Sequence, residues 1–132
     1  MPRTLVTVAT YNEIGNVPTL VEELFHAAPT VDLLVIDDAS PDGTGRWVDE
    51  RAAHDQRVRG LNRSGKLGLG SALLAGLRYA IEHNYEFVLH MDGDLSHPPR
   101  FVPALLEAIE ARRDPPLDVV IGSRYVPGGR IE

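Results

Sequence analysis

Hydrophobic and polar positions along this chain predict short strands separated by helices. Continuous apolar runs such as residues 33–36 are typical of strands covered on both faces, as in a parallel sheet. Between the runs, apolar residues recur at helical spacing. The predicted strands cover residues 5–10, 33–36, 58–62, 87–91 and 119–121.

The helical patterns have recognisable starts and stops. Asn16 is placed as a cap for the first helix, and Asn84 is placed to stop the third. The predicted helices cover residues 17–28, 47–54, 69–81 and 101–109. In the third helix, one apolar face is expected to contain Leu69, Leu73, Leu77, Ala80 and Ile81.

This alternation predicts one domain over residues 1–132, a three-layer α/β/α sandwich of Rossmann-like type with right-handed crossovers. In such folds, ligands bind beyond the carboxyl ends of the strands. The residues that follow each predicted strand are therefore the candidates for chemistry.

Composition narrows the classes of function. Apolar residues make up 43% of the chain, enough for a core, and the formal charge of −6 argues against general affinity for nucleic acid. The absence of cysteine excludes disulfides and a thiolate nucleophile. No apolar run approaches the roughly 20 residues that cross a bilayer, and no signal-peptide pattern is present.

Polar residues follow the first two predicted strands. The Tyr11 ring could stack on a nucleobase and Glu13 could accept hydrogen bonds from a base or ribose, although an ordinary loop would look the same. Asp37 and Asp38 are adjacent carboxylates whose repulsion is usually compensated by ribose hydroxyls, base N–H groups or a cation. The alternative is a pair of solvated turn residues.

Cations precede the third helix. Arg63 and Lys66 lie just before a glycine-rich helix start, where free N–H groups and the helix dipole favour an anion such as a diphosphate. A flexible, solvated loop is the alternative. After the fifth predicted strand, Arg124 has the planar fork suited to phosphate, or is an ordinary surface arginine.

Asp92-Gly93-Asp94 is the strongest local signal. In extended backbone, residues i and i+2 point the same way, so Asp92 and Asp94 could face one cation, and Gly93 could let a ligand approach the backbone. Oxygen ligands suit Mg²⁺ or Mn²⁺. The alternative is a tight polar turn. His90, inside the strand, is expected to be a buried, hydrogen-bonded residue rather than a base.

In this order, the motifs resemble family-two glycosyltransferases, particularly dolichol-phosphate or polyprenol-phosphate mannosyltransferases. The resemblance covers residues 10–129 and rests on Thr-Tyr-Asn-Glu, Asp-Asp-Ala-Ser-Pro-Asp-Gly-Thr, Lys-Leu-Gly-Leu-Gly-Ser-Ala, Met-Asp-Gly-Asp-Leu-Ser-His-Pro-Pro and Gly-Ser-Arg-Tyr-Val-Pro-Gly-Gly. It implies the GT-A type of fold and the transfer, with inversion, of a sugar from GDP-mannose to dolichyl or polyprenyl phosphate. Members of the family continue beyond the position of residue 132, so the chain is expected to be truncated relative to the family fold.

The resemblance also implies roles for residues. Those that would bind the nucleotide sugar are Ala9, Tyr11, Glu13, Ile36, Asp38, Lys66, Asp92, Gly93, Asp94 and Arg124. Asp92, Asp94 and Arg124 would be catalytic, with Asp92 and Asp94 as ligands of Mg²⁺ or Mn²⁺. This chain departs from the family at Ala9, usually proline, at Gly93, usually alanine, and at Ser96, which is glutamine in some relatives.

The resemblance implies a cytoplasmic location or one at the cytoplasmic face of the membrane, through peripheral contact or a separate membrane subunit. Two other functions stay open: a glycosyltransferase with a saccharide acceptor, and a nucleotide-binding module without turnover. A phosphate acceptor is already anionic at neutral pH, so it needs cations to position it rather than a strong general base. A sugar hydroxyl would need such a base.

Overall fold

The computed structural model describes residues 3–111, 114–123 and 125–129 of the chain. At its centre, four parallel strands form one sheet in the order β3-β2-β1-β4. The strands are β1 (Thr4–Thr10), β2 (Asp32–Asp37), β3 (Val58–Asn62) and β4 (Phe87–Asp92). Four of the five strands predicted from the sequence are therefore confirmed, within a residue at either end.

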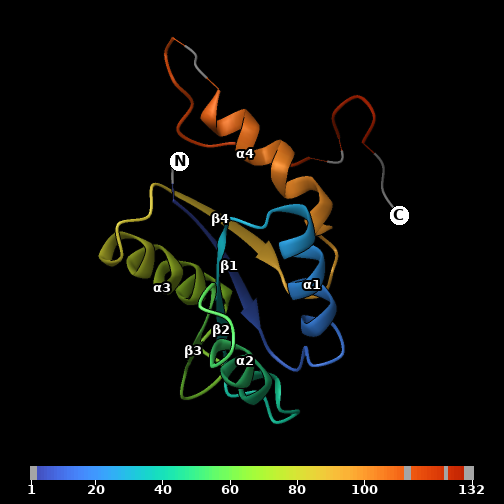
Figure 1. Cartoon of the computed structure of the whole chain (residues 1–132), viewed down its shortest axis with the longest axis vertical. Helices are drawn as coiled ribbons and strands as arrows, with labels where there is room; N and C mark the ends of the chain where they lie inside the picture. The colour runs from blue at the N-terminus through green and yellow to red at the C-terminus, as the bar shows by residue number, and fades with distance from the viewer. Residues whose placement is uncertain (1–2, 112–113, 124, 130–132) are drawn as a thin grey trace.

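Helices cover both faces of the sheet, which confirms the predicted three-layer architecture. Helices α1 and α4 lie on one face and α3 on the other, as Figure 1 shows. The bounds are α1 Val17–Ala27, α2 Thr44–Ala52, α3 Leu69–Glu82, a 3₁₀ turn η1 Pro99–Phe101 and α4 Val102–Glu110. Asn84 follows the end of α3 in a left-handed conformation (φ 61°), as a helix stop requires.

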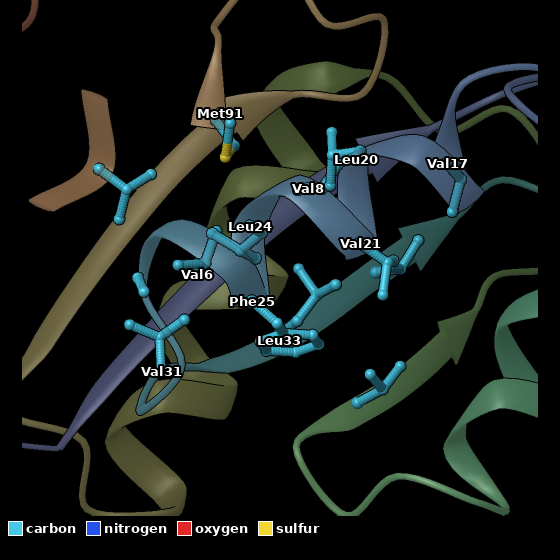
Figure 2. Packing of buried hydrophobic residues seen from close by; sticks show 14 of the residues in the cluster. Val6, Val8, Val17, Leu20, Val21, Leu24, Phe25, Val31, Leu33 and Met91 are labelled. Carbon is cyan, nitrogen blue, oxygen red and sulfur yellow. The ribbon is translucent and has the colours of Figure 1, made fainter. Parts of the chain in front are cut away.

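The larger core lies between the sheet and α1. Figure 2 shows Val6 and Val8 of β1 packed beside Leu20 and Leu24 of α1, with Leu33 of β2 close by. All five side chains are fully buried. Burying one such side chain contributes about 1.5–3 kcal/mol relative to exposing it, so this layer fixes how α1 and the loop before it sit against the sheet.

The opposite face is packed differently from the sequence-based prediction. The side of α3 that lies against the sheet carries the small residues Ala72, Gly76 and Ala80. A Cβ at Gly76 would come within 3.0 Å of Thr7 Cγ2 on β1. This close approach leaves no room for a leucine. The predicted apolar face, apart from Ala80, is exposed instead: Leu69, Leu73, Leu77 and Ile81 are 37–77% accessible.

The prediction of a fifth strand over residues 119–121 was wrong. In the described part of the chain after α4, no strand is assigned. Val119 and Ile121 are 71% and 81% exposed, and Figure 1 shows this segment away from the sheet. An apolar run becomes a strand only when a neighbouring strand pairs with its backbone, and none of the four described strands does so here.

Within the described residues, none of the helices combines the length and the apolar character that a membrane crossing needs.

Candidate functional site

The candidate residues gather at the carboxyl edge of the sheet, where the four loops that follow the strands meet. In the sheet register, Ala9 of β1 lies between Ile36 of β2 and Asp92 of β4. Three residues proposed from the sequence are thus placed in one row across the sheet. Parallel strands end at the same edge, which is where ligands bind in open α/β sheets.

Three of these four loops contain a non-glycine residue with a left-handed backbone. Asn12 after β1, Ala39 after β2 and Leu95 after β4 have φ values of 56°, 54° and 67°. Such conformations are costly for residues with a Cβ and cluster at functional sites. This edge of the sheet therefore stands out by its backbone as well as by its motifs.

Two residues predicted to bind the nucleotide sugar meet across the edge. The Lys66 ammonium lies 4.6 Å from the centre of the Tyr11 ring, a cation–π contact between the loops that follow β3 and β1. Tyr11 is 40% exposed, so part of its ring is accessible to a ligand. Glu13 is half-buried and its carboxylate accepts a hydrogen bond of 2.9 Å from Asn16 Nδ2.

The two adjacent aspartates after β2 have separate partners. Asp38 is paired with Arg63, whose Nε lies 2.6 Å from Oδ1 and whose Nη2 lies 2.8 Å from Oδ2. These hydrogen bonds from Arg63 hold the pKa of Asp38 below its usual value. The cation that compensates Asp38 in this structure is therefore a side chain of the chain itself.

This pair also changes the role expected for Arg63. Besides Asp38, its guanidinium donates to Ser71 Oγ at 2.7 Å and to the carbonyl of Gly68 at 3.0 Å. Its four donated hydrogen bonds thus join the loop after β2, through Asp38, to the start of α3, through Gly68 and Ser71. Of the two cations that the sequence placed before this helix, Lys66 is the exposed one.

Asp37 is a structural residue. It is 2% exposed, and its carboxylate accepts hydrogen bonds from Thr10 Oγ1 at 2.7 Å and from the amide and hydroxyl of Ser40. These bonds join the end of β1 to the loop after β2. The buried carboxylate of Asp37 therefore fixes the conformation of the loop after β2.

Asp92 is the last residue of β4, and Asp94 lies on the loop that follows it. Asp92 is partly exposed and Asp94 is exposed. Asp94 Oδ1 accepts hydrogen bonds from the hydroxyl of Ser96 at 2.6 Å and from its amide at 3.0 Å. The hydrogen bond from the Ser96 side chain is the main reason why the pKa of Asp94 is lowered. Ser96, at the position where some relatives have glutamine, orients a carboxylate here.

These carboxylates fit a divalent cation that is shared with a ligand. In the described ranges, no group of three or more His, Cys, Asp or Glu side chains is arranged to hold a metal. Mg²⁺ and Mn²⁺ commonly bind through one or two carboxylates, with phosphates and water as further ligands. An ionised Asp94 whose second oxygen accepts no hydrogen bond from the described residues suits that arrangement.

His97 supports the same loop. Its Nδ1 accepts the backbone N–H of Asp92 at 3.0 Å, and its Nε2 lies 3.7 Å from the Asp92 carboxylate. His90 is half-buried, and its Nδ1 lies 3.0 Å from Thr7 Oγ1. Burial lowers the pKa of His90. The hydrogen bond expected for His90 is present at Nδ1, but the side chain is only half-buried and its Nε2 has no partner among the described residues.

Two candidate residues are not open to a ligand through their side chains. Ile36 is fully buried in the cluster beneath α3. Gly93 is also buried, and a Cβ there would meet Thr10 Cγ2 at 3.1 Å and Val8 Cγ1 at 3.2 Å. The absence of a side chain at Gly93 allows packing against β1, rather than the close approach of a ligand expected from the sequence. Arg124 lies outside the described residues.

Comparison with protein families gives one decisive match. The model of the family described as "Glycosyl transferase family 2" matches residues 5–131. The chain belongs to this family. The match includes the whole sheet and all four loops of the candidate site, which agrees with the fold and motifs found independently.

Two curated relatives are about half identical to this family 2 chain. The undecaprenyl-phosphate mannosyltransferase of Micrococcus luteus is 49% identical over 98% of the chain and 51% of its own length. The polyprenol monophosphomannose synthase of Mycolicibacterium smegmatis is 47% identical over 98% of the chain and 48% of its own length. The chain therefore spans about half the length of these relatives.

A solved structure supports the assignment to this family. A mannosyltransferase from Pyrobaculum calidifontis, in complex with GDP-Man and Mn²⁺, superposes with a TM-score of 0.70 at 26% identity. The superposition covers 83% of this family 2 chain and 33% of the other. The GT-A-type sandwich expected from the motifs is thereby confirmed.

Proposed function

We propose that this chain carries the donor-binding part of a mannosyltransferase that moves mannose from GDP-mannose to a polyprenyl phosphate. The observation that carries the proposal is the identity of 49% and 47%, over nearly the whole chain, to two enzymes named for such lipid phosphates. The gathering of the candidate residues at one edge of the sheet supports it.

The nucleotide would lie over the loops that follow β1, β2 and β3. Tyr11 would stack on the base, and Glu13 and Asp38 would accept hydrogen bonds from base or ribose. Lys66, which is exposed beside Tyr11, would face the diphosphate. A cation at the start of a glycine-rich helix is well placed to bind such an anion. Arg124, outside the described residues, stays a predicted phosphate ligand.

Asp92 and Asp94 would hold Mn²⁺ or Mg²⁺ next to the diphosphate. When bound, such an ion acts as a Lewis acid that neutralises charge on the departing group. Ser96 keeps the Asp94 carboxylate oriented through its hydrogen bond, and His97 holds the backbone at Asp92 through the N–H that it accepts. In this proposal, the position of Asp92 and Asp94 would determine where the diphosphate of the donor lies.

In the proposed reaction, an oxygen of the acceptor phosphate attacks the anomeric carbon from the face opposite the leaving group. The new bond joins that carbon to the acceptor oxygen. The bond to the diphosphate breaks, and GDP leaves with the electron pair, which inverts the anomeric configuration. Because the acceptor phosphate is already ionised, no side chain has to remove a proton. Cations such as Lys66 position the two anions.

The lipid acceptor implies contact with a membrane surface. We propose that the protein works at the cytoplasmic face, through peripheral contact or with a separate membrane subunit.

The test is Asp94→Ala, compared with Glu107→Ala, an exposed carboxylate on α4. Transfer of radiolabelled mannose from GDP-mannose to polyprenyl phosphate, with Mn²⁺, should fall at least about a hundredfold for Asp94→Ala and stay unchanged for Glu107→Ala. Undiminished transfer by Asp94→Ala would refute the metal assignment. GDP binding by the unsubstituted chain without any transfer would support a binding module instead.

A further inference from the structure

The loop after β1 is fastened to the loop after β2 by side chains that the proposed function does not use. Three consecutive backbone N–H groups of the first loop each donate to a side chain of the second. Asn12 donates to Ser40 Oγ at 2.9 Å, Glu13 to Thr44 Oγ1 at 3.0 Å and Ile14 to Asp42 Oδ2 at 3.1 Å. Residues 12–14 precede α1, so the helix does not supply acceptors for these amides.

The three acceptors are themselves held in place. The hydroxyl of Ser40 donates to the buried carboxylate of Asp37 at 2.6 Å, and the hydroxyl of Thr44 donates to Asp42 Oδ1. A hydroxyl has one proton, so each of these oxygens can only accept from the amide opposite it. Thr44 is fully buried. The direction of the hydrogen bonds between the loops is therefore fixed.

These bonds hold a backbone that would otherwise relax. Asn12 and Ala39, one in each loop, are both left-handed, which L-residues with a side chain adopt at a cost. Tyr11 and Glu13 flank Asn12. A change in the backbone at Asn12 would therefore move both side chains that are proposed to contact the nucleoside.

We infer that Ser40, Asp42 and Thr44 are positioning residues that hold residues 11–14 in the shape that binds the donor nucleotide. The inference rests on the proposed function, because it needs Tyr11 and Glu13 to contact the nucleotide. Without these hydrogen bonds, the competent loop is one conformer among several, and the apparent affinity falls by the fraction of time that it is populated.

The test compares Thr44→Val with Thr44→Ser. Valine keeps the volume but loses the hydroxyl, whereas serine keeps the hydroxyl. Titration calorimetry of GDP with Mn²⁺ should show binding about tenfold weaker for Thr44→Val and near the original value for Thr44→Ser. Thr19→Val, at an exposed position on α1, is the matched control and should bind as the unsubstituted chain does.

A second measurement separates positioning from general damage. Affinity for Mn²⁺ alone, followed by electron paramagnetic resonance, should be unchanged in Thr44→Val, because Asp92 and Asp94 lie on another loop. Should Thr44→Val fail to fold, Ser40→Ala removes one of the three bonds at a less buried position and should weaken GDP binding several-fold.

Four results would overturn the inference, and the last of them would also overturn the proposed function. Equal GDP affinity in the Thr44→Val variant and the unsubstituted chain would show that the hydrogen bonds are irrelevant to binding. Equal weakening of GDP binding by Thr44→Ser would show that the hydroxyl is not the group that matters. A parallel loss of Mn²⁺ affinity would show general damage to the site rather than loss of positioning. An unsubstituted chain that binds no GDP would overturn the proposed function, and the inference with it.

Discussion

Replacing Arg63 with methionine tests the ion pair that joins the loops after β2 and β3. The side chains of Arg63 and Asp38 are each 10% exposed, and two hydrogen bonds of 2.6 and 2.8 Å link them. Methionine keeps most of the apolar stem and removes the charge. The substitution therefore leaves a nearly buried carboxylate without its cation.

The expected cost follows from that burial. Removing one partner of a buried ion pair typically costs about 3–5 kcal/mol, because the remaining charge stays desolvated. Asp38 keeps one backbone hydrogen bond, from the amide of Leu67 at 3.2 Å, and a little contact with water. We therefore expect the free energy of unfolding to fall by about 3 kcal/mol, at the lower end of that range.

Urea unfolding at pH 7 measures this loss. The single tryptophan, Trp47, packs against the core cluster, so its fluorescence follows unfolding. Arg59→Met is the matched control, because Arg59 is an exposed residue of β3 with no ion pair among the described residues. It should change the free energy of unfolding by less than about 0.5 kcal/mol.

The pH dependence gives the sharper test. Arg63 lowers the folded-state pKa of Asp38 below its usual value, so the pair stabilises the fold at pH values above that usual pKa. The contribution is lost as the pH falls through the lowered pKa. The difference between the Arg63→Met variant and the unsubstituted chain should therefore be smaller at an acidic pH, where the carboxylate is protonated, than at pH 7. An equal difference at both pH values, or an equal effect of Arg59→Met, would refute the ion-pair explanation.

Two further predictions concern stability. Hydrogen bonds from Arg57 lower the pKa of Asp55 to about 2, so Asp55→Asn should reduce the free energy of unfolding by about 1–2 kcal/mol at pH 7. That loss should fade as the pH drops from about 4 towards 2 in urea titrations, since the carboxylate is then protonated, and a pH-independent loss would contradict it. On α3, Leu74→Gln should be neutral within about 0.5 kcal/mol and Ala72→Gln should cost more than about 2, because Leu74 is 55% exposed and Ala72 is 1% exposed. Thermal melting of both variants measures the two losses of stability. A larger loss for Leu74→Gln than for Ala72→Gln would show that α3 packs through its leucines.

The sequence was sufficient for the features that depend on neighbouring residues. Apolar runs and helical spacing placed four strands and four helices, because those patterns depend on residues a few positions apart. The position of the site also followed, because parallel strands bring their carboxyl ends to one edge. Tyr11, Lys66 and Asp94 were placed at that edge in this way, just beyond a strand or before a helix, and Asp92 was placed at the end of β4.

Only the tertiary structure decided which surfaces pack. Helix α3 has two apolar faces with the same period, one of leucines and one of alanine and glycine, and the spacing cannot choose between them. The choice depends on the distance between the helix and the sheet. That distance is short because Gly76 has no side chain to keep the helix away from Thr7. The run at residues 119–121 was misassigned for a similar reason, because a strand needs a pairing partner that the run itself does not specify.

The partners of the polar side chains were also decided by the fold. Arg63 and Asp38 are 25 residues apart, and the amides of residues 12–14 find their acceptors 28–31 residues away. In the sequence, Arg63 resembled a ligand for an anion, and Ser40, Asp42 and Thr44 were members of one motif of the family resemblance without a role of their own. The sequence gives the charge of each side chain and its hydrogen-bond donors and acceptors. The partner of each side chain is decided only when the sheet brings distant loops together.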